Sequence, residues 1–221
     1  MKLLKKIPKK IKVTFIILPL VSLYTIICSM HYVSAISNDL CNSVFRLHII
    51  ANSDSKEDQD LKYKVRDNVI DYMNSLCSSA NSKEEVISIA NNNLNDFKQI
   101  ALDTIKENGF DYDVSVEINN VFFPTKTYGD ISLPEGYYDA LRIKIGKSTG
   151  QNWWCVMFPP LCFVDVSSGI VPAESKELMK ENLTEEEYDL ISTGNNQNSE
   201  IKFKFKLIEL FNHNNIITAK N

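Results

Sequence analysis

The chain has 221 residues, of which 24 are basic and 28 acidic, and its formal net charge at pH 7 is −4. Six of the basic residues are lysines within the first twelve positions, so 18 basic and 28 acidic residues remain beyond residue 35, a net charge of −10. A domain this acidic is a poor candidate for binding nucleic acid or anionic lipid, and its length of about 185 residues is that of one domain with a real hydrophobic core.

The first predicted element is an apolar segment behind the lysine cluster. Residues 13–30 carry no charge, and the small residues Val33, Ser34 and Ala35 follow. This order of parts describes a secretory signal peptide, but about eighteen apolar residues also approach the length that spans a bilayer. We therefore expect residues 1–35 to be a signal peptide cleaved after Ala35 or an uncleaved anchor, with the lysines inside and the rest of the chain outside.

A strand is predicted over residues 41–50, where apolar and polar side chains alternate. The break ANSDS follows, and then a helix over residues 56–76 with apolar residues at helical spacing. Polar residues gather where the strand meets the helix, a common position for binding residues. This candidate partner surface comprises His48, Asn52, Asp54, Gln59, Arg66 and Asp67.

The acids of the same break, Asp54, Asp58 and Asp60, also suggest a calcium loop. An EF-hand needs acids at alternate positions, a central glycine and a terminal glutamate, and no glycine is present here. Helix capping and a solvated first turn explain these acids better. We expect no metal site and no cofactor.

A second helix is predicted from Ser82, which forms a capping box with Glu85, to Gly109. A strand over residues 112–119, an ordered aromatic loop, a hairpin of residues 141–146 with 153–158, two short helices and a last strand over residues 201–207 complete the pattern. The second hairpin strand is apolar on both faces, so we expect it to be central or doubly covered. The two short helices are expected near residues 175–181 and 184–191, and Thr184 and Glu187 form another capping box.

The order β-α-α-β-β-β-α-β predicts a single α+β domain with a mostly antiparallel sheet and helices packed on one face. We place this exported domain at residues 36–212, with a polar tail at residues 213–221. The adjacent Trp153 and Trp154 should face opposite sides of their strand. Both tryptophans are candidates for the partner surface, because exposed tryptophan is enriched at protein contacts.

Four cysteines lie beyond the leader, and the sequence does not choose among their three pairings. They are Cys41, Cys77, Cys155 and Cys162. A disulfide between Cys155 and Cys162 across the Pro159-Pro160 bend and two buried free thiols are the main alternatives. Zinc is weaker, because six residues separate the two cysteines and structural zinc favours closer pairs.

A secreted cysteine hydrolase is the alternative function. Cys155 would be the nucleophile and His48 the base, with Asp54 or Asp165 orienting the imidazole. Cys155 lies in an apolar strand, however, where the pKa of a thiol tends to rise rather than fall. We therefore expect a protein that is not an enzyme.

Three stretches together resemble one family, the stage II sporulation protein R of endospore-forming bacteria. They are FRLHIIANSDSKEDQDLKYKVRDNVI at residues 45–70, FFPTKTYGDISLPEGYYDALRIKIGKSTGQNWWCVMFPPLCFVD at residues 122–165, and IKFKFKLIELF near the C-terminus. Their order is that of the family, and family members also carry an N-terminal signal or anchor.

The resemblance implies a role in signalling between compartments. Proteins of this family are made in the forespore and exported into the space between the two septal membranes. There they activate a membrane-embedded aspartic protease of the mother cell, which cleaves the precursor of the early mother-cell sigma factor. The family is not known for catalysis or for a cofactor.

Overall fold

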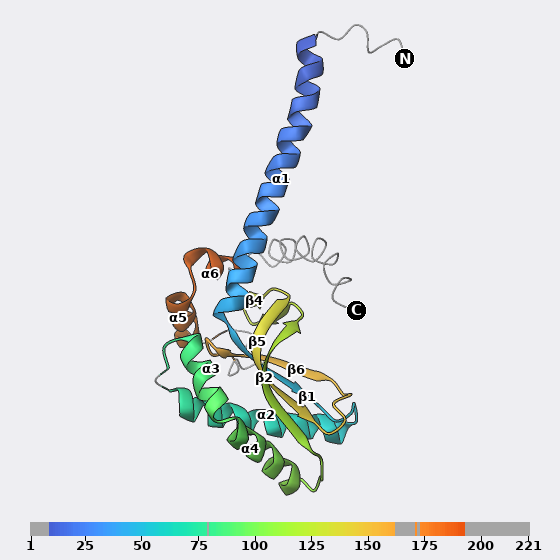
Figure 1. Ribbon diagram of the computed structural model, residues 1–221, viewed down its shortest axis with the longest axis vertical. Coiled ribbons are helices and arrows are strands. Elements are labelled where there is room, and N and C mark those ends of the chain that lie inside the picture. Colours follow the sequence, from blue (N-terminus) through green and yellow to red (C-terminus); the bar gives the residue numbers. More distant parts are fainter. Residues whose placement is uncertain (1–8, 79, 162–170, 172, 193–221) are drawn as a thin grey trace.

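The computed structural model describes residues 9–78, 80–161, 171 and 173–192 of the chain. These residues form an N-terminal helical segment and one α+β domain, which confirms the predicted fold class (Figure 1). The elements in chain order are α1 (Lys9–Ser43), β1 (Phe45–Ile50), α2 (Lys56–Cys77), α3 (Lys83–Asn92), α4 (Leu94–Glu107), β2 (Val114–Phe123), β3 (Lys126–Tyr128), β4 (Ile131–Leu133), β5 (Gly136–Ile145), β6 (Asn152–Phe158), α5 (Ala173–Asn182) and α6 (Glu185–Ile191).

Helix α1 includes the apolar segment of the predicted leader and continues beyond residue 35 to Ser43. The part that follows Val13 is apolar, exposed and long enough to cross a membrane, and it projects from the domain (Figure 1). Leu40 and Cys41, near the end of the helix, are instead buried against the domain. An N-terminal apolar helix of this kind is compatible with a signal or an anchor, and cleavage after Ala35 remains a prediction.

Four strands form one sheet in the order β2-β5-β1-β6. β1 pairs in parallel with β5 and antiparallel with β6, and β2 pairs antiparallel with β5. β1 is central, and all six of its residues are buried. β6 ends the described sheet. Cys155 and Val156 are buried in different clusters on its two faces, so the expectation of a strand that is central or doubly covered is met by double coverage.

Helices α2, α3 and α4 cover one face of the sheet. Alternate β1 residues point into this layer because successive side chains of a strand face opposite sides. The helical stripe predicted for α2 is confirmed. The residues of this cluster from β1 and α2 are Phe45, Leu47, Ile49, Leu61, Val65, Val69, Ile70 and Met73.

A second cluster lies on the other face, where the end of α1, the β3–β4 hairpin, α5 and α6 meet. Helices therefore pack on both faces of the sheet rather than on the one face that was predicted. Arg46 of β1 points into this layer and is fully buried. Its guanidinium carbon lies 4.0 Å from the ring centre of Phe123 and 4.7 Å from that of Tyr138. Arg46 Nη2 donates to the Tyr128 hydroxyl at 2.6 Å, and its Nε donates to the Cys155 carbonyl at 3.3 Å.

Three details of the predicted order differ. The expected hairpin of residues 141–146 with 153–158 is wrong, because β1 lies between β5 and β6 and pairs with both. The helix expected from Ser82 onwards is two helices, α3 and α4, that meet at Asn93. The side chain of Asn93 donates to the Ile89 carbonyl at 2.8 Å and its backbone N–H bonds to the Ala90 carbonyl, which closes α3. The aromatic loop contains the hairpin β3–β4, and the strand expected at residues 201–207 lies outside the described residues.

Candidate partner-binding surface

Asp58 organises the corner between β1 and α2. Its carboxylate accepts the Asn52 side-chain amide at 2.8 Å and the Ser53 hydroxyl at 2.5 Å. The N-cap Ser55 accepts the Asp58 N–H at 3.2 Å. Burial alone would raise the pKa of Asp58, but hydrogen bonds led by those from Ser53 and Asn52 outweigh it, and the pKa is lowered.

The same corner holds the turn between β5 and β6. The side-chain amide oxygen of Asn52 accepts the Lys147 N–H at 2.9 Å, and the Asp54 carboxylate accepts the Gln151 N–H at 2.8 Å. Gln59 donates to the Ser53 carbonyl at 2.8 Å and accepts from the Lys62 ammonium at 2.6 Å. Three residues predicted to lie on the partner surface therefore bond within the chain: Asn52, Asp54 and Gln59. We call these residues, which hold the β5–β6 turn against the β1–α2 corner, the turn clamp.

His48 and Trp154 lie together on the opposite side of the sheet from α2. Their rings are stacked, with centroids 3.9 Å apart and an angle of 14° between the planes. His48 Nε2 lies 2.8 Å from the Asn152 side-chain oxygen. Burial lowers the pKa of His48 from 6.5 to about 4, opposed by the Asn152 hydrogen bond and reinforced by Arg142 and Lys144.

Because the imidazole is neutral and 3 % exposed, we expect stability to depend on pH through His48. The unfolded chain takes up a proton near pH 6.5, whereas the folded chain takes it up only near pH 4. The free energy of unfolding should therefore fall as pH drops between these values, by about 3 kcal/mol in total. Urea unfolding across this pH range checks the slope, and His48→Gln should remove this contribution while the carboxylate contributions remain.

Trp153, Arg66 and Asp67 form a separate patch on the α2 side. The Arg66 guanidinium lies 4.4 Å from the Trp153 ring centre and 5.1 Å from that of Tyr63, which is 37 % exposed. Asp67 pairs with Arg66 at 2.6 Å. The two tryptophans thus face opposite sides of β6, as predicted, and the expected partner residues fall into three places rather than one surface.

The cysteine chemistry differs from that of a hydrolase. Cys155 is disulfide-bonded, whereas Cys28, Cys41 and Cys77 carry free thiols. The expected partner of the bridge, Cys162, lies outside the described residues, as does Asp165, so the pairing stays a prediction. Cys155 also packs in the helix-side cluster while His48 faces the other side of the sheet.

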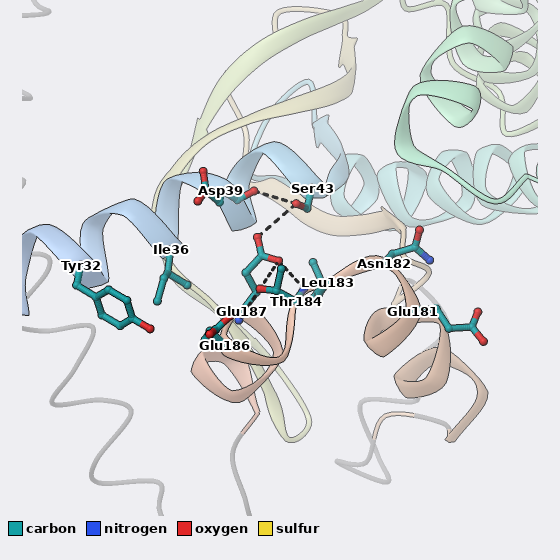
Figure 2. Close-up of a pocket in the computed structure, with 10 residues that line it drawn as sticks. All are labelled: Tyr32, Ile36, Asp39, Ser43, Glu181, Asn182, Leu183, Thr184, Glu186 and Glu187. Atoms are coloured by element: carbon teal, nitrogen blue, oxygen red, sulfur yellow. Dashed lines mark hydrogen bonds between the residues drawn. The ribbon is translucent and has the colours of Figure 1, made fainter.

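A hollow of about 650 Å³ lies between α1 and the α5–α6 connection (Figure 2). The α1 residues on this side recur at helical spacing, and the opposite wall is acidic. Thr184 caps α6 in a capping box with Glu187, and the Ser43 hydroxyl lies 3.5 Å from Glu187 Oε1. The lining comprises Tyr32, Ile36, Asp39, Ser43, Glu181, Asn182, Leu183, Thr184, Glu186 and Glu187.

No local pattern in the sequence indicates this hollow, although the Thr184–Glu187 capping box beside it was predicted. The boundary predicted at residue 35 runs through the α1 wall of this hollow. It placed Tyr32 in the leader and Ile36, Asp39 and Ser43 in the domain. In the part of the chain that the structure describes, no group of three His, Cys, Asp or Glu side chains could hold a metal ion.

Comparison with known proteins identifies the family. Residues 41–168 match the family described as stage II sporulation protein R (spore_II_R). The stage II sporulation protein R of Bacillus subtilis (strain 168) is 40 % identical over 141 residues, which cover 63 % of this chain and 63 % of that relative. No solved structure matches the chain. The chain belongs to the stage II sporulation protein R family.

Proposed function

We propose that this sporulation protein is an exported signal that activates a membrane-embedded aspartic protease across the septum. Family membership is the observation that carries the proposal. The exposed apolar part of α1 supports export, because such a helix enters a membrane as a signal or an anchor. The lysines before it favour retention of the N-terminus inside, which directs the domain outwards.

The proposed location is the space between forespore and mother cell. The domain would there meet the protease that cleaves the precursor of the early mother-cell sigma factor. Binding activates a protease only if the domain prefers the competent conformation over the resting one. The role therefore needs a binding surface and no catalytic group of this chain.

The alternative of a secreted cysteine hydrolase has little support from the geometry. A nucleophilic cysteine needs a free thiolate beside a base. Cys155 is disulfide-bonded, and its side chain and that of His48 belong to opposite faces of the sheet.

Reconstitution of precursor cleavage tests the proposal. The full chain, the membrane aspartic protease of the same organism and its sigma-factor precursor would be combined in phospholipid vesicles. We expect cleavage to rise with the concentration of the folded chain, because binding shifts the protease towards its competent state. The product would be measured by immunoblot.

Two controls define the outcome. Heat-unfolded chain should give background cleavage. Cys155→Ser, which removes the nucleophile that a hydrolase would need, should retain activation as long as the variant stays folded at the assay pH. Background cleavage with the folded chain would contradict the activator role. Cleavage of the precursor by this chain without the protease would instead favour the hydrolase.

A further inference from the structure

The outer edge of β2 lacks the features that usually block a sheet edge. β2 spans ten residues and lies at the end of the described sheet (Figure 1). All ten residues pair with β5 in one continuous register. The strand contains no proline and a single charged residue, Glu117. Natural edge strands are commonly short, bulged or guarded by lysine or proline, because a long regular edge is a template for another strand.

The register fixes which backbone groups point outwards. Gly146 donates its N–H to the Asp113 carbonyl at 2.8 Å, and residues 113 and 146 continue the register of β2 with β5. In an antiparallel pair such hydrogen-bonded positions alternate, so odd-numbered residues bond β5 and even-numbered residues face outwards. The Val114 N–H accordingly bonds the Asp113 side chain at 3.2 Å.

The other outward positions are Val116, Ile118, Asn120 and Phe122. Across the described ranges, no backbone or side-chain group is hydrogen-bonded to their outward N–H groups. The edge therefore offers four alternate positions, each with a donor and an acceptor, to an extended chain.

The two flanks of this edge differ in polarity. On the helix side, Val116 and Ile118 are partly exposed and pack against the helix-side cluster. On the other side, Ser115 and Asn119 are exposed, and Glu117 is paired with the Lys144 ammonium at 2.7 Å. A strand laid along this edge would therefore place apolar side chains on the helix side and polar side chains on the other.

We propose that the β2 edge accepts an extended segment of a partner protein as a fifth strand, with apolar residues at alternate positions of that segment. Main-chain hydrogen bonds would supply affinity and the alternating side chains specificity. The inference rests on the proposed function, since the partner is taken to be the protease that the chain activates.

A second copy of this chain fits the edge less well. Phe123, at one end of β2, packs in the same cluster as Leu40 and Cys41 of α1. Two identical edges related by a two-fold axis run antiparallel, so the two α1 helices would leave the joined sheet at opposite ends. Copies held by α1 in one membrane could not pair in this way.

Substitution of Asn120 tests the edge with little effect on the sheet. Its side chain is exposed and its N–H points outwards, the position at which an edge strand tolerates proline. Asn120→Pro removes this donor and places a ring on the edge. Asn120→Ala is the matched control, because both variants lose the side-chain bond to Asp139 at 3.1 Å but only proline blocks the edge.

In the reconstituted cleavage assay, we expect Asn120→Pro to raise the chain concentration for half-maximal cleavage about 10-fold or more, and Asn120→Ala to match the unsubstituted chain. Equal activation by the proline and alanine variants would overturn the edge proposal while leaving the activator role intact. If the unsubstituted chain itself gave only background cleavage, the proposed function would be contradicted instead.

Hydrogen exchange gives a readout that does not depend on cleavage or on the substitution. The amides of Val116, Ile118 and Phe122 should exchange fast in the free full chain and slowly when the vesicle-embedded protease is added. Protection already present in the free chain would show that the chain covers its own edge, and protection that rises with chain concentration would show a second copy. Either result would overturn the proposal.

Discussion

Replacing Arg46 by alanine should lower the free energy of unfolding by about 3–5 kcal/mol, the range of large buried side chains truncated to alanine. Arg46 is fully buried between the sheet and the aromatic rings of Phe123 and Tyr138. Truncation would leave a cavity and would remove the donor to the Tyr128 hydroxyl. Urea unfolding followed by tryptophan fluorescence measures the loss, because Trp153 and Trp154 lie in the same sheet.

Arg46→Met separates the packing of this side chain from its charge. No carboxylate forms an ion pair with Arg46 among the described residues, so methionine leaves no buried acid unpaired. Burial of a charge without an ionic partner costs free energy, so an apolar side chain of similar volume should fill the same space without that cost. We expect Arg46→Met to recover most of the loss, and a methionine variant as unstable as alanine would show that the cation itself stabilises the fold.

Elements with local signals are predicted well from this sequence. The stripe of Leu61, Val65, Val69 and Met73 was readable because helical spacing depends only on neighbouring turns. The Thr184–Glu187 capping box is confirmed for the same reason. At Ser82 only half of the predicted box is present, because Ser82 accepts the Glu85 N–H while the Glu85 side chain accepts the Asn81 N–H at 3.0 Å.

Features set by distant segments were not predictable. The parallel pairing of β1 with β5 joins strands that are far apart in sequence. Asn52 and Asp54 were predicted to lie on the partner surface, since a polar break before a helix is commonly exposed. Both side chains accept backbone N–H groups of the β5–β6 turn, and no local pattern in the sequence reveals that contact. Their place on a partner surface stays a prediction.

Gly150 lies in the β5–β6 turn that the turn clamp holds, and the structure leaves no room for a larger side chain at this position. A Cβ atom there would lie 2.2 Å from the Ser53 carbonyl oxygen and 3.0 Å from the Ala51 Cβ. The first contact is with backbone, so a rotamer change cannot relieve it. The Gly150 N–H also bonds the Ala51 carbonyl at 3.0 Å, and this bond would lengthen as the turn moves away. Gly150→Ala should therefore destabilise the fold by about 3 kcal/mol, the upper range for overpacking.

Gly109→Ala separates steric contact from backbone conformation. Gly109 has φ of +81°, and a Cβ atom there would meet nothing within 4 Å. Only the left-handed conformation should cost stability, about 1–2 kcal/mol. Thermal unfolding of the two variants should therefore show the larger loss for Gly150→Ala, although its glycine does not lie in the left-handed region. If the order were reversed, the close approach of the β5–β6 turn to the β1–α2 corner would not be what requires glycine at position 150.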